Sequence, residues 1–198
     1  MEPSHDPISK ETSDADLVAV VVQGDAAAFE LLFKRHRQRV ATIAGRFFQQ
    51  APQIEDVIQE TFVKAYFGLS GFSQYKVDSF AHWLARIAFN SCYDELRKQS
   101  RKREQSFADF SDSERQELSK LTSNMRVTTV ESAAINRDLA HKLLRLLSAE
   151  DRIVLVLLDV EGLSVAEIAR LMDWSSAKVK IRAFRARTDL RRLLKKFL

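Results

Sequence analysis

Apolar side chains recur three, four or seven residues apart along almost the whole chain, and this spacing constrains the fold more than any other feature. It predicts a series of helices that each bury one apolar face. One such stripe runs from Phe29 to Phe47, a second from Ile54 to Tyr66 and a third from Phe80 to Leu96. The 198 residues include only 5 Gly and 3 Pro, too few for the tight turns of sandwiches and barrels. We therefore expect an all-α fold.

A change in composition divides the helical pattern into two parts. Residues 101–130 are rich in Ser, Arg, Glu, Gln and Lys and lack a sustained apolar stripe, which is typical of a flexible linker. We expect one small helical domain over residues 12–100, a flexible linker over residues 101–130 and a second small helical domain over residues 131–198.

The chain lacks the sequence features of a membrane protein or a secreted protein. Its longest strongly apolar runs, residues 17–22 and 153–158, have six residues each, whereas about 20 are needed to span a bilayer. The first residues are acidic, which is wrong for a secretory signal. We therefore expect a cytoplasmic protein without membrane insertion.

No constellation of residues favours catalysis or metal binding. The single cysteine, Cys92, excludes an internal disulfide and a cysteine-built zinc site. Four histidines are scattered along the sequence and pair with no obvious nucleophile or ligand set: His5, His36, His82 and His141. There is no P-loop and no GxGxxG pattern. We expect no enzymatic activity, no catalytic residues, no metal and no cofactor.

Two serine caps mark helix starts in the second domain. Ser148 has an acid three residues later and precedes residues 153–158, which are apolar on all sides and predict a central, buried helix. Ser164 and Glu167 form a capping box that opens a short helix.

The second domain ends in a helix-turn-helix pattern. The short helix ends at Met172, a tight turn follows at residues 173–175, and a longer basic helix covers Ser176–Leu194. Residues 178–196 contain nine basic residues and one acid. This charge is typical of a polyanion partner, although a solvated helix face would also account for it.

A helical wheel at about 100° per residue divides the basic helix into faces. An apolar face is expected in the core: Val179, Ala183, Ala186 and Leu190. The opposite face is mixed: Ile181, Phe184, Arg185 and Thr188. Basic side chains lie between the apolar face and the mixed face: Lys178, Lys180, Arg182 and Arg187. Arginine can bind guanine and apolar groups can touch the thymine methyl, so the mixed face suits major-groove reading. Alternatively, its two large apolar residues pack on another helix.

Two features of the first domain suggest partners. Residues 80–98 combine aromatic and basic side chains, which suits single-stranded DNA, although the spacing of Trp83 and Ile87 favours the core for those two. The second feature is acidic: Asp56, Gln59 and Glu60 share one helix face at i, i+3 and i+4. Such a face favours a protein partner or is simply solvated.

These segments resemble the motifs of sigma-70 family factors. Residues 55–65 look like the helix that binds core RNA polymerase, and residues 80–97 resemble the helix that melts and reads the −10 element. Residues 161–169 and 179–187 are similar to the −35-reading helix-turn-helix, and residues 16–29 match the opening helix. With only two domains, the chain is similar to the extracytoplasmic-function (ECF) class.

The resemblance implies a function and its site residues. It implies a sigma factor that binds core RNA polymerase through the β′ and β subunits, reads −35 and −10 promoter elements and stabilises the melted −10 strand. It implies polymerase contacts by one set of residues: Asp56, Gln59 and Glu60. It implies −10 DNA contacts by a second set: Phe72, Tyr75, Asn90, Arg97 and Lys98. It implies −35 DNA contacts by a third set: Lys178, Lys180, Ile181, Arg182, Phe184, Arg185 and Arg187.

Two departures from the family pattern and two alternative functions stay open. Ser148 stands where the family often has Pro, and Ala177-Lys178 stands where it often has Gly-Thr. The main alternative is a helix-turn-helix repressor or activator that binds duplex DNA as a dimer. Another is an interaction module that binds polymerase without initiating transcription. The sequence leaves open whether an anti-sigma factor is a further partner.

Overall fold

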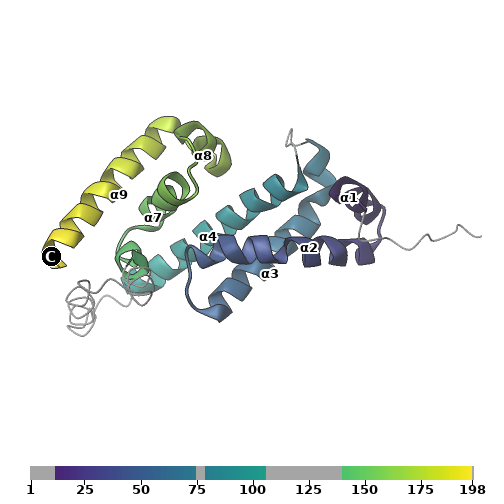
Figure 1. The fold of residues 1–198 in the computed structure, drawn as a ribbon, viewed down its shortest axis with the longest axis horizontal. Helices are drawn as coiled ribbons and strands as arrows, with labels where there is room; N and C mark the ends of the chain where they lie inside the picture. The colour runs from purple at the N-terminus through teal and green to yellow at the C-terminus, as the bar shows by residue number, and fades with distance from the viewer. Residues whose placement is uncertain (1–11, 75–78, 106–139, 198) are drawn as a thin grey trace, which may run out of the picture. The chain divides into compact units, whose positions relative to one another are not determined.

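The computed structural model describes residues 12–74, 79–105 and 140–197. Every regular element in these ranges is helical, which confirms the expected all-α class (Figure 1). The chain divides into two compact units between Cys92 and Tyr93, and each unit is described by itself. Helix α4 continues to Gln105, and the expected linker beyond residue 105 lies outside the described residues.

The described residues of the first unit form four α-helices and one 3₁₀ helix: α1 (Asp14–Val22), α2 (Ala26–Gly45), α3 (Ala51–Gly68), η1 (Leu69–Gln74) and the start of α4 (Phe80–Gln105). Local signals explain where the helices begin. The Ser13 side chain accepts a hydrogen bond from the Asp16 N–H, and the Asp25 side chain accepts from the first turn of α2. Gly24 adopts a φ of 106° in the tight link between α1 and α2, where a side chain would be strained.

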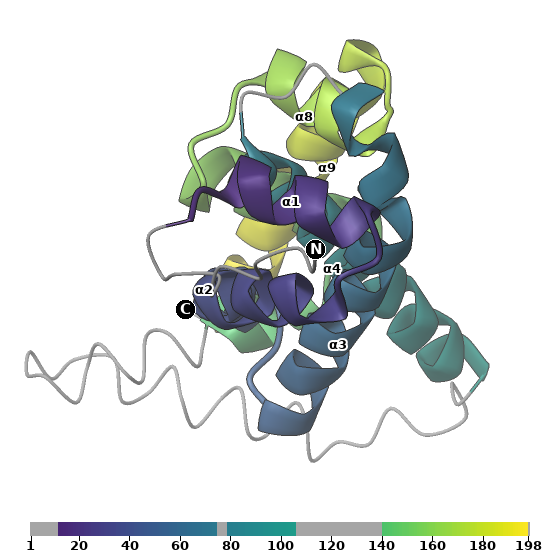
Figure 2. The same ribbon diagram turned by 90° about the vertical axis from the view of Figure 1, so that its right-hand side faces the viewer.

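The core of the first unit follows the three apolar stripes. Helix α1 packs on α2, and α2 packs on α3 (Figures 1 and 2). Fully or almost fully buried side chains come from each helix: Leu17, Leu32, Val40, Phe47, Val57, Ile58 and Leu84. Aromatic edges join the helices, since Phe29 and Phe33 of α2 both contact the ring of Phe62 in α3. Trp83 is 4% exposed, which confirms its expected place in the core.

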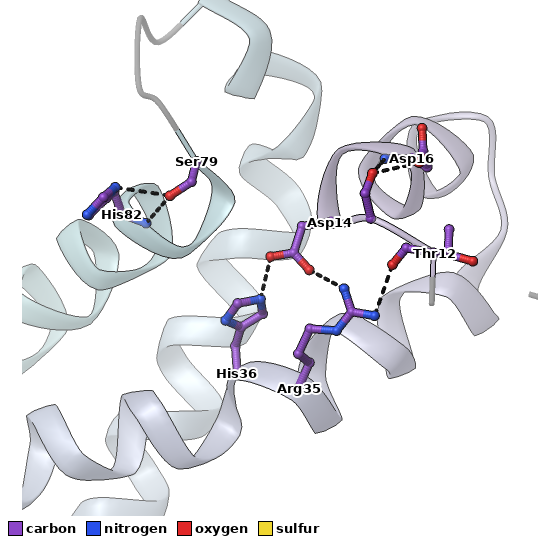
Figure 3. Close-up of polar contacts among 8 residues, drawn as sticks. Thr12, Asp14, Asp16, Arg35, His36, Ser79 and His82 are labelled. Atoms are coloured by element: carbon purple, nitrogen blue, oxygen red, sulfur yellow. Dashed lines mark hydrogen bonds and ion pairs between the residues drawn. The ribbon is translucent and has the colours of Figure 1, made fainter. Parts of the chain in front are cut away.

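A polar cluster that the sequence did not predict fastens α1 to α2 (Figure 3). The Asp14 carboxylate lies 2.7 Å from Nε2 of His36 and 2.5 Å from Nη1 of Arg35, and Arg35 also donates to the Thr12 carbonyl at 3.0 Å. His36 is buried, and its ring contacts the ring of Phe80 at the start of α4 with centroids 5.2 Å apart. One histidine therefore links three helices.

The second unit contains a helical segment at residues 140–145, followed by α7 (Ala149–Leu155), the π-helical turn η2 (Val156–Val160), α8 (Val165–Met172) and α9 (Ser176–Phe197). Ser148 caps α7, and the expected capping box of α8 is complete, with both the Ser164 and the Glu167 side chains bonded to backbone N–H groups. Residues 153–157 are buried, as the apolar run predicts, and Leu158 is half-buried. None of the described helices combines the length and apolar character needed to cross a bilayer.

The His36 cluster yields a test of the first unit. We expect His36→Ala to lower the free energy of unfolding of this unit by about 1–3 kcal/mol, because it removes ring packing and leaves Asp14 without one partner. Urea denaturation in a Trp174→Phe background measures this, since Trp83 fluorescence then reports the first unit alone. Lys34→Ala, which breaks only the exposed pair with Glu30, should change stability by less than about 0.5 kcal/mol. Equal effects of the two variants would contradict the linking role.

Candidate nucleic-acid interface

The turn between α8 and α9 sets where the longer helix begins. Asp173 ends α8 in the left-handed conformation, with a φ of 54°, which aspartate adopts more readily than most residues. The Trp174 N–H donates to the Ala169 carbonyl at 2.9 Å, and the Lys178 N–H donates to the Ser175 hydroxyl at 3.1 Å. Because α7 and α8 both pack against α9, this turn holds α9 across them (Figure 1).

One face of α9 is buried and the opposite face is open. Val179, Ala183 and Ala186 are 6% exposed or less, whereas Ile181 is 53% and Phe184 is 73% exposed. The helical wheel is therefore confirmed for these residues, whereas Leu190 of the expected core face and Thr188 of the opposite face are both half-buried. Within the described residues, the two large apolar side chains of the mixed face are not covered by another helix.

Two flanking cations of α9 are held by one carboxylate of α7. Lys178 Nζ lies 2.8 Å from Oε1 of Glu150, and the Arg182 guanidinium pairs with the other oxygen of the same carboxylate. Arg182 Nη1 also lies 3.5 Å from Oδ1 of Asp151. Lys178 Nζ sits 3.8 Å from the centre of the Trp174 ring, which adds a cation–π contact.

The other predicted −35 cations divide into one paired and two unpaired residues. Arg187 Nη2 lies 2.7 Å from Oδ1 of Asp159. Lys180 and Arg185 are exposed and have no ion-pair partner among the described residues. The two unpaired cations lie next to Ile181 and Phe184, so the open face combines apolar groups with free positive charge.

The predicted −10 residues are spread along α4 and η1. Phe72 of η1 is half-buried, and its ring lies 5.2 Å from that of Trp83. Asn90 is half-buried on α4, while Arg97 and Lys98 are exposed about 10 Å further along the helix axis. Tyr75 lies outside the described residues. Phe72 and Asn90 belong to the first unit, whereas Arg97 and Lys98 belong to the second.

The predicted polymerase-binding residues lie on α3. Asp56 and Gln59 are exposed, and the carboxylate of Glu60 is paired with Lys64 at 2.9 Å. An apolar patch that the sequence analysis missed continues along the same helix: Val63, Tyr66 and Phe67, which are 55%, 42% and 78% exposed. Their spacing at i, i+3 and i+4 indicates that the three side chains share one helix face. The patch was missed because Tyr66 also fits the buried stripe, and its ring contacts Phe29.

Comparison with known proteins identifies the family. Residues 32–102 match the model of sigma-70 region 2, and residues 137–190 match that of sigma-70 region 4. The chain is 34% identical to the ECF RNA polymerase sigma-E factor of Escherichia coli (strain K12) over 184 residues, which cover 91% of this chain and 93% of that protein. It is 32% identical to the ECF RNA polymerase sigma factor SigM of Mycobacterium tuberculosis (strain ATCC 25618 / H37Rv), covering 93% and 86%. The chain belongs to the sigma-70 family.

Solved structures agree with this assignment. A structure of CnrH in complex with the cytosolic domain of CnrY is similar with a TM-score of 0.54 and 26% identity, covering 93% of this chain and 99% of that one. The sigma factor RpoE, solved with the anti-sigma factor NepR from Bartonella quintana, shares the fold with a TM-score of 0.55 and 23% identity over 84% of this chain and 96% of that one.

Membership of the sigma-70 family confirms the predicted function. The chain is a sigma factor that directs promoter-specific transcription, its partners are core RNA polymerase and promoter DNA, and such factors are not enzymes. A dimeric repressor would account for the region 4 match but not for region 2. Within the described part of the sigma factor, there is no group of three or more His, Cys, Asp or Glu side chains that could hold a metal ion.

The carboxylate between α7 and α9 of this sigma factor carries a shifted pKa. Burial opposes its charge, but the hydrogen bond from Lys178 and the charges of Arg182 and Lys178 outweigh burial, so the pKa of Glu150 is lowered from its ordinary value of 4.5. A lowered folded-state pKa contributes stability that is complete above pH 4.5 and is lost as the pH falls through the folded-state pKa.

This linkage predicts a pH-dependent effect of Glu150→Gln. The variant should unfold at a lower temperature than the native chain near pH 7, and the difference should narrow below the ordinary Glu pKa of 4.5, because native Glu150 then becomes protonated. Thermal unfolding followed by Trp174 fluorescence in a Trp83→Phe background measures this. Glu30→Gln, in the first unit, should leave the second unit's profile unchanged. A difference that stays constant from pH 7 to pH 3 would contradict the assignment.

Proposed function

We propose that α9 reads the −35 element through Lys180, Ile181, Phe184 and Arg185. The observation that supports this most directly is the open mixed face, which lies opposite the buried stripe and carries Arg185, with Lys180 at its edge. Arg185 can bind a guanine edge with two hydrogen bonds, and the apolar side chains suit thymine methyl groups. Nothing else in the described part of the chain occupies these side chains.

We assign the other three predicted −35 residues to the DNA backbone. Lys178, Arg182 and Arg187 flank the reading face, where phosphates run when a helix lies in the major groove. Each is already paired with a carboxylate, so each reaches a phosphate only by leaving or sharing that partner. Their contribution to affinity should therefore be smaller than that of a free cation.

We propose that the exposed face of α3 formed by Asp56, Gln59 and Glu60 binds core RNA polymerase. Its carboxylates would repel DNA phosphates but suit a basic protein surface. The exposed patch of Val63, Tyr66 and Phe67 continues this face with apolar area, as protein interfaces commonly do.

We further propose that α4 holds the opened −10 strand. Asn90 would contact a base, while Arg97 and Lys98 would follow the phosphates of the single strand. Tyr75 would stack on a base, whereas Phe72 would mainly support η1, because its ring already packs on Phe80 and Trp83.

Two further proposals concern the cellular location of the chain and a protein that regulates it. We propose that it acts in the cytoplasm, where core polymerase and promoters are found. We also propose that a protein of the anti-sigma class binds it. Support comes from two similar structures, CnrH in complex with the cytosolic domain of CnrY and the sigma factor RpoE in complex with the anti-sigma factor NepR.

The reading face yields a test of base recognition. We expect Arg185→Ala to cost roughly 1–3 kcal/mol at the preferred −35 sequence and to relax preference at one or two base pairs, since a bidentate base contact is lost. The measurement is binding of holoenzyme, made from core polymerase and the full chain, to duplexes recovered from a pool with randomised −35 positions.

Two matched variants control for charge. Arg191→Ala removes another exposed cation of α9, six residues and about 9 Å further along the helix axis than Arg185, and should leave base preference intact. Arg187→Ala should weaken binding to all sequences alike and only slightly, because Asp159 already neutralises this side chain. If Arg185→Ala weakens every sequence equally, Arg185 contacts phosphate and the proposed orientation of α9 is wrong.

The polymerase-binding face yields a separate test. We expect Gln59→Ala combined with Glu60→Lys to weaken binding to core polymerase at least tenfold, because the change reverses a charge within the proposed interface. Glu30→Lys is the control, since Glu30 on α2 also forms an exposed i, i+4 pair with a lysine. Fluorescence anisotropy with labelled full-length chain and core polymerase measures both affinities. Equal affinity of the double variant and the native chain would refute this assignment.

A further inference from the structure

Glu150 stands out as the one side chain in the described second unit whose carboxylate pairs with two cations of the reading helix. Lys178 and Arg182 lie one turn apart on α9, and each forms an ion pair with a different carboxylate oxygen of Glu150. Asp151, the next residue on α7, lies within 3.5 Å of Arg182. The four side chains together carry no net charge.

These pairs are better shielded from solvent than the other ion pair between α9 and the rest of the unit. The side chains of Glu150 and Arg182 are 23% and 26% exposed, whereas those of Asp159 and Arg187 are 48% and 49% exposed. Charge pairs that are partly withdrawn from water attract more strongly and are screened less by salt. Lys178 is held additionally by the Trp174 ring.

We propose that Glu150 restrains sequence-independent DNA binding by withholding Lys178 and Arg182 from phosphates. This inference rests on the proposed function of α9. Phosphate contacts supply nearly all non-specific affinity, whereas base edges are read by other side chains. Lys180 and Arg185, which flank the exposed apolar groups, stay unpaired in the same structure. Lys180 and Arg185 therefore stay available for base contacts, while Glu150 neutralises the two cations that the phosphates of any DNA sequence would attract.

The arrangement explains why Lys178 is tolerated at the turn into the reading helix. A lysine beside the first turn of α9 adds a positive charge close to the expected DNA backbone. Glu150 and Trp174 hold that charge on the protein side. The consequence is that the free chain binds DNA of arbitrary sequence more weakly than the charge of α9 alone would allow.

Glu150→Gln tests this restraint. The glutamine keeps the shape of the side chain but cannot neutralise two cations, so both become available to phosphates. We expect affinity of the full chain for a 30-bp duplex of scrambled sequence to rise roughly three- to tenfold at low salt. The slope of log affinity against log salt should become steeper by about one to two units, since each phosphate contact contributes about 0.9. No gain at low salt would overturn the proposal.

Glu167→Gln is the matched control. It removes the same charge from the same unit, and glutamine preserves the capping box, but Glu167 pairs with no cation of α9 in the described structure. Its salt slope should equal that of the native chain. An equal steepening in both variants would show that net charge alone matters and would overturn the role of Glu150.

One double substitution, made both in the native chain and in the Glu150→Gln variant, keeps the test independent of folding. Lys178→Ala with Arg182→Ala should change the native salt slope by less than about half a unit, because Glu150 already withholds both cations. The same double change should abolish the gain caused by Glu150→Gln. A loss of nearly two units in the native background would show that both cations already contact phosphate and would overturn the proposal. Failure of the −35 proposal would instead appear as unchanged base preference in Arg185→Ala.

Discussion

Burial of the apolar stripe on α9 is the constraint on which the rest of the second unit depends. Val179, Ala183 and Ala186 must face α7 and α8, since leaving them in water would forfeit the hydrophobic stabilisation that holds the three helices together. Once that face is fixed, the 100° step of the helix leaves no choice about what points outward. The reading face is therefore a geometric consequence of the core.

The first unit is organised around larger side chains. Rings from α2, α3 and α4 meet edge to face, and Gly68 lies so close to Trp83 that an added Cβ would be 3.2 Å from its ring. The His36–Asp14 pair adds a directional contact to this apolar packing and fixes α1 against it. A rigid helical body of this kind can present α3 to one macromolecule and α4 to another without rearrangement.

Sequence reasoning succeeded where the relevant physics is local. The caps at Ser148 and Ser164 and the faces of α9 depend on residues within a turn or two, so the periodicity and capping rules predicted them. It failed where contacts join distant segments. Periodicity does not predict the ion pairs of Glu150, because Lys178 and Arg182 follow it by 28 and 32 positions in the sequence. It also does not predict the contact of His36 with Asp14 or the packing of Phe72 on Trp83. The π-helical turn after Leu155 also interrupts a pattern that reads as one continuous helix.

The open face of α9 has an evolutionary consequence. Ile181, Phe184, Lys180 and Arg185 contribute almost nothing to the core, so their replacement changes folding stability little. Other residues stabilise the fold, namely the buried stripe of α9 and the residues that pair with Glu150. On the roles proposed for these four residues, promoter preference can drift at four positions while the scaffold stays intact, so duplicated copies of such a gene can acquire distinct regulons without passing through unfolded intermediates.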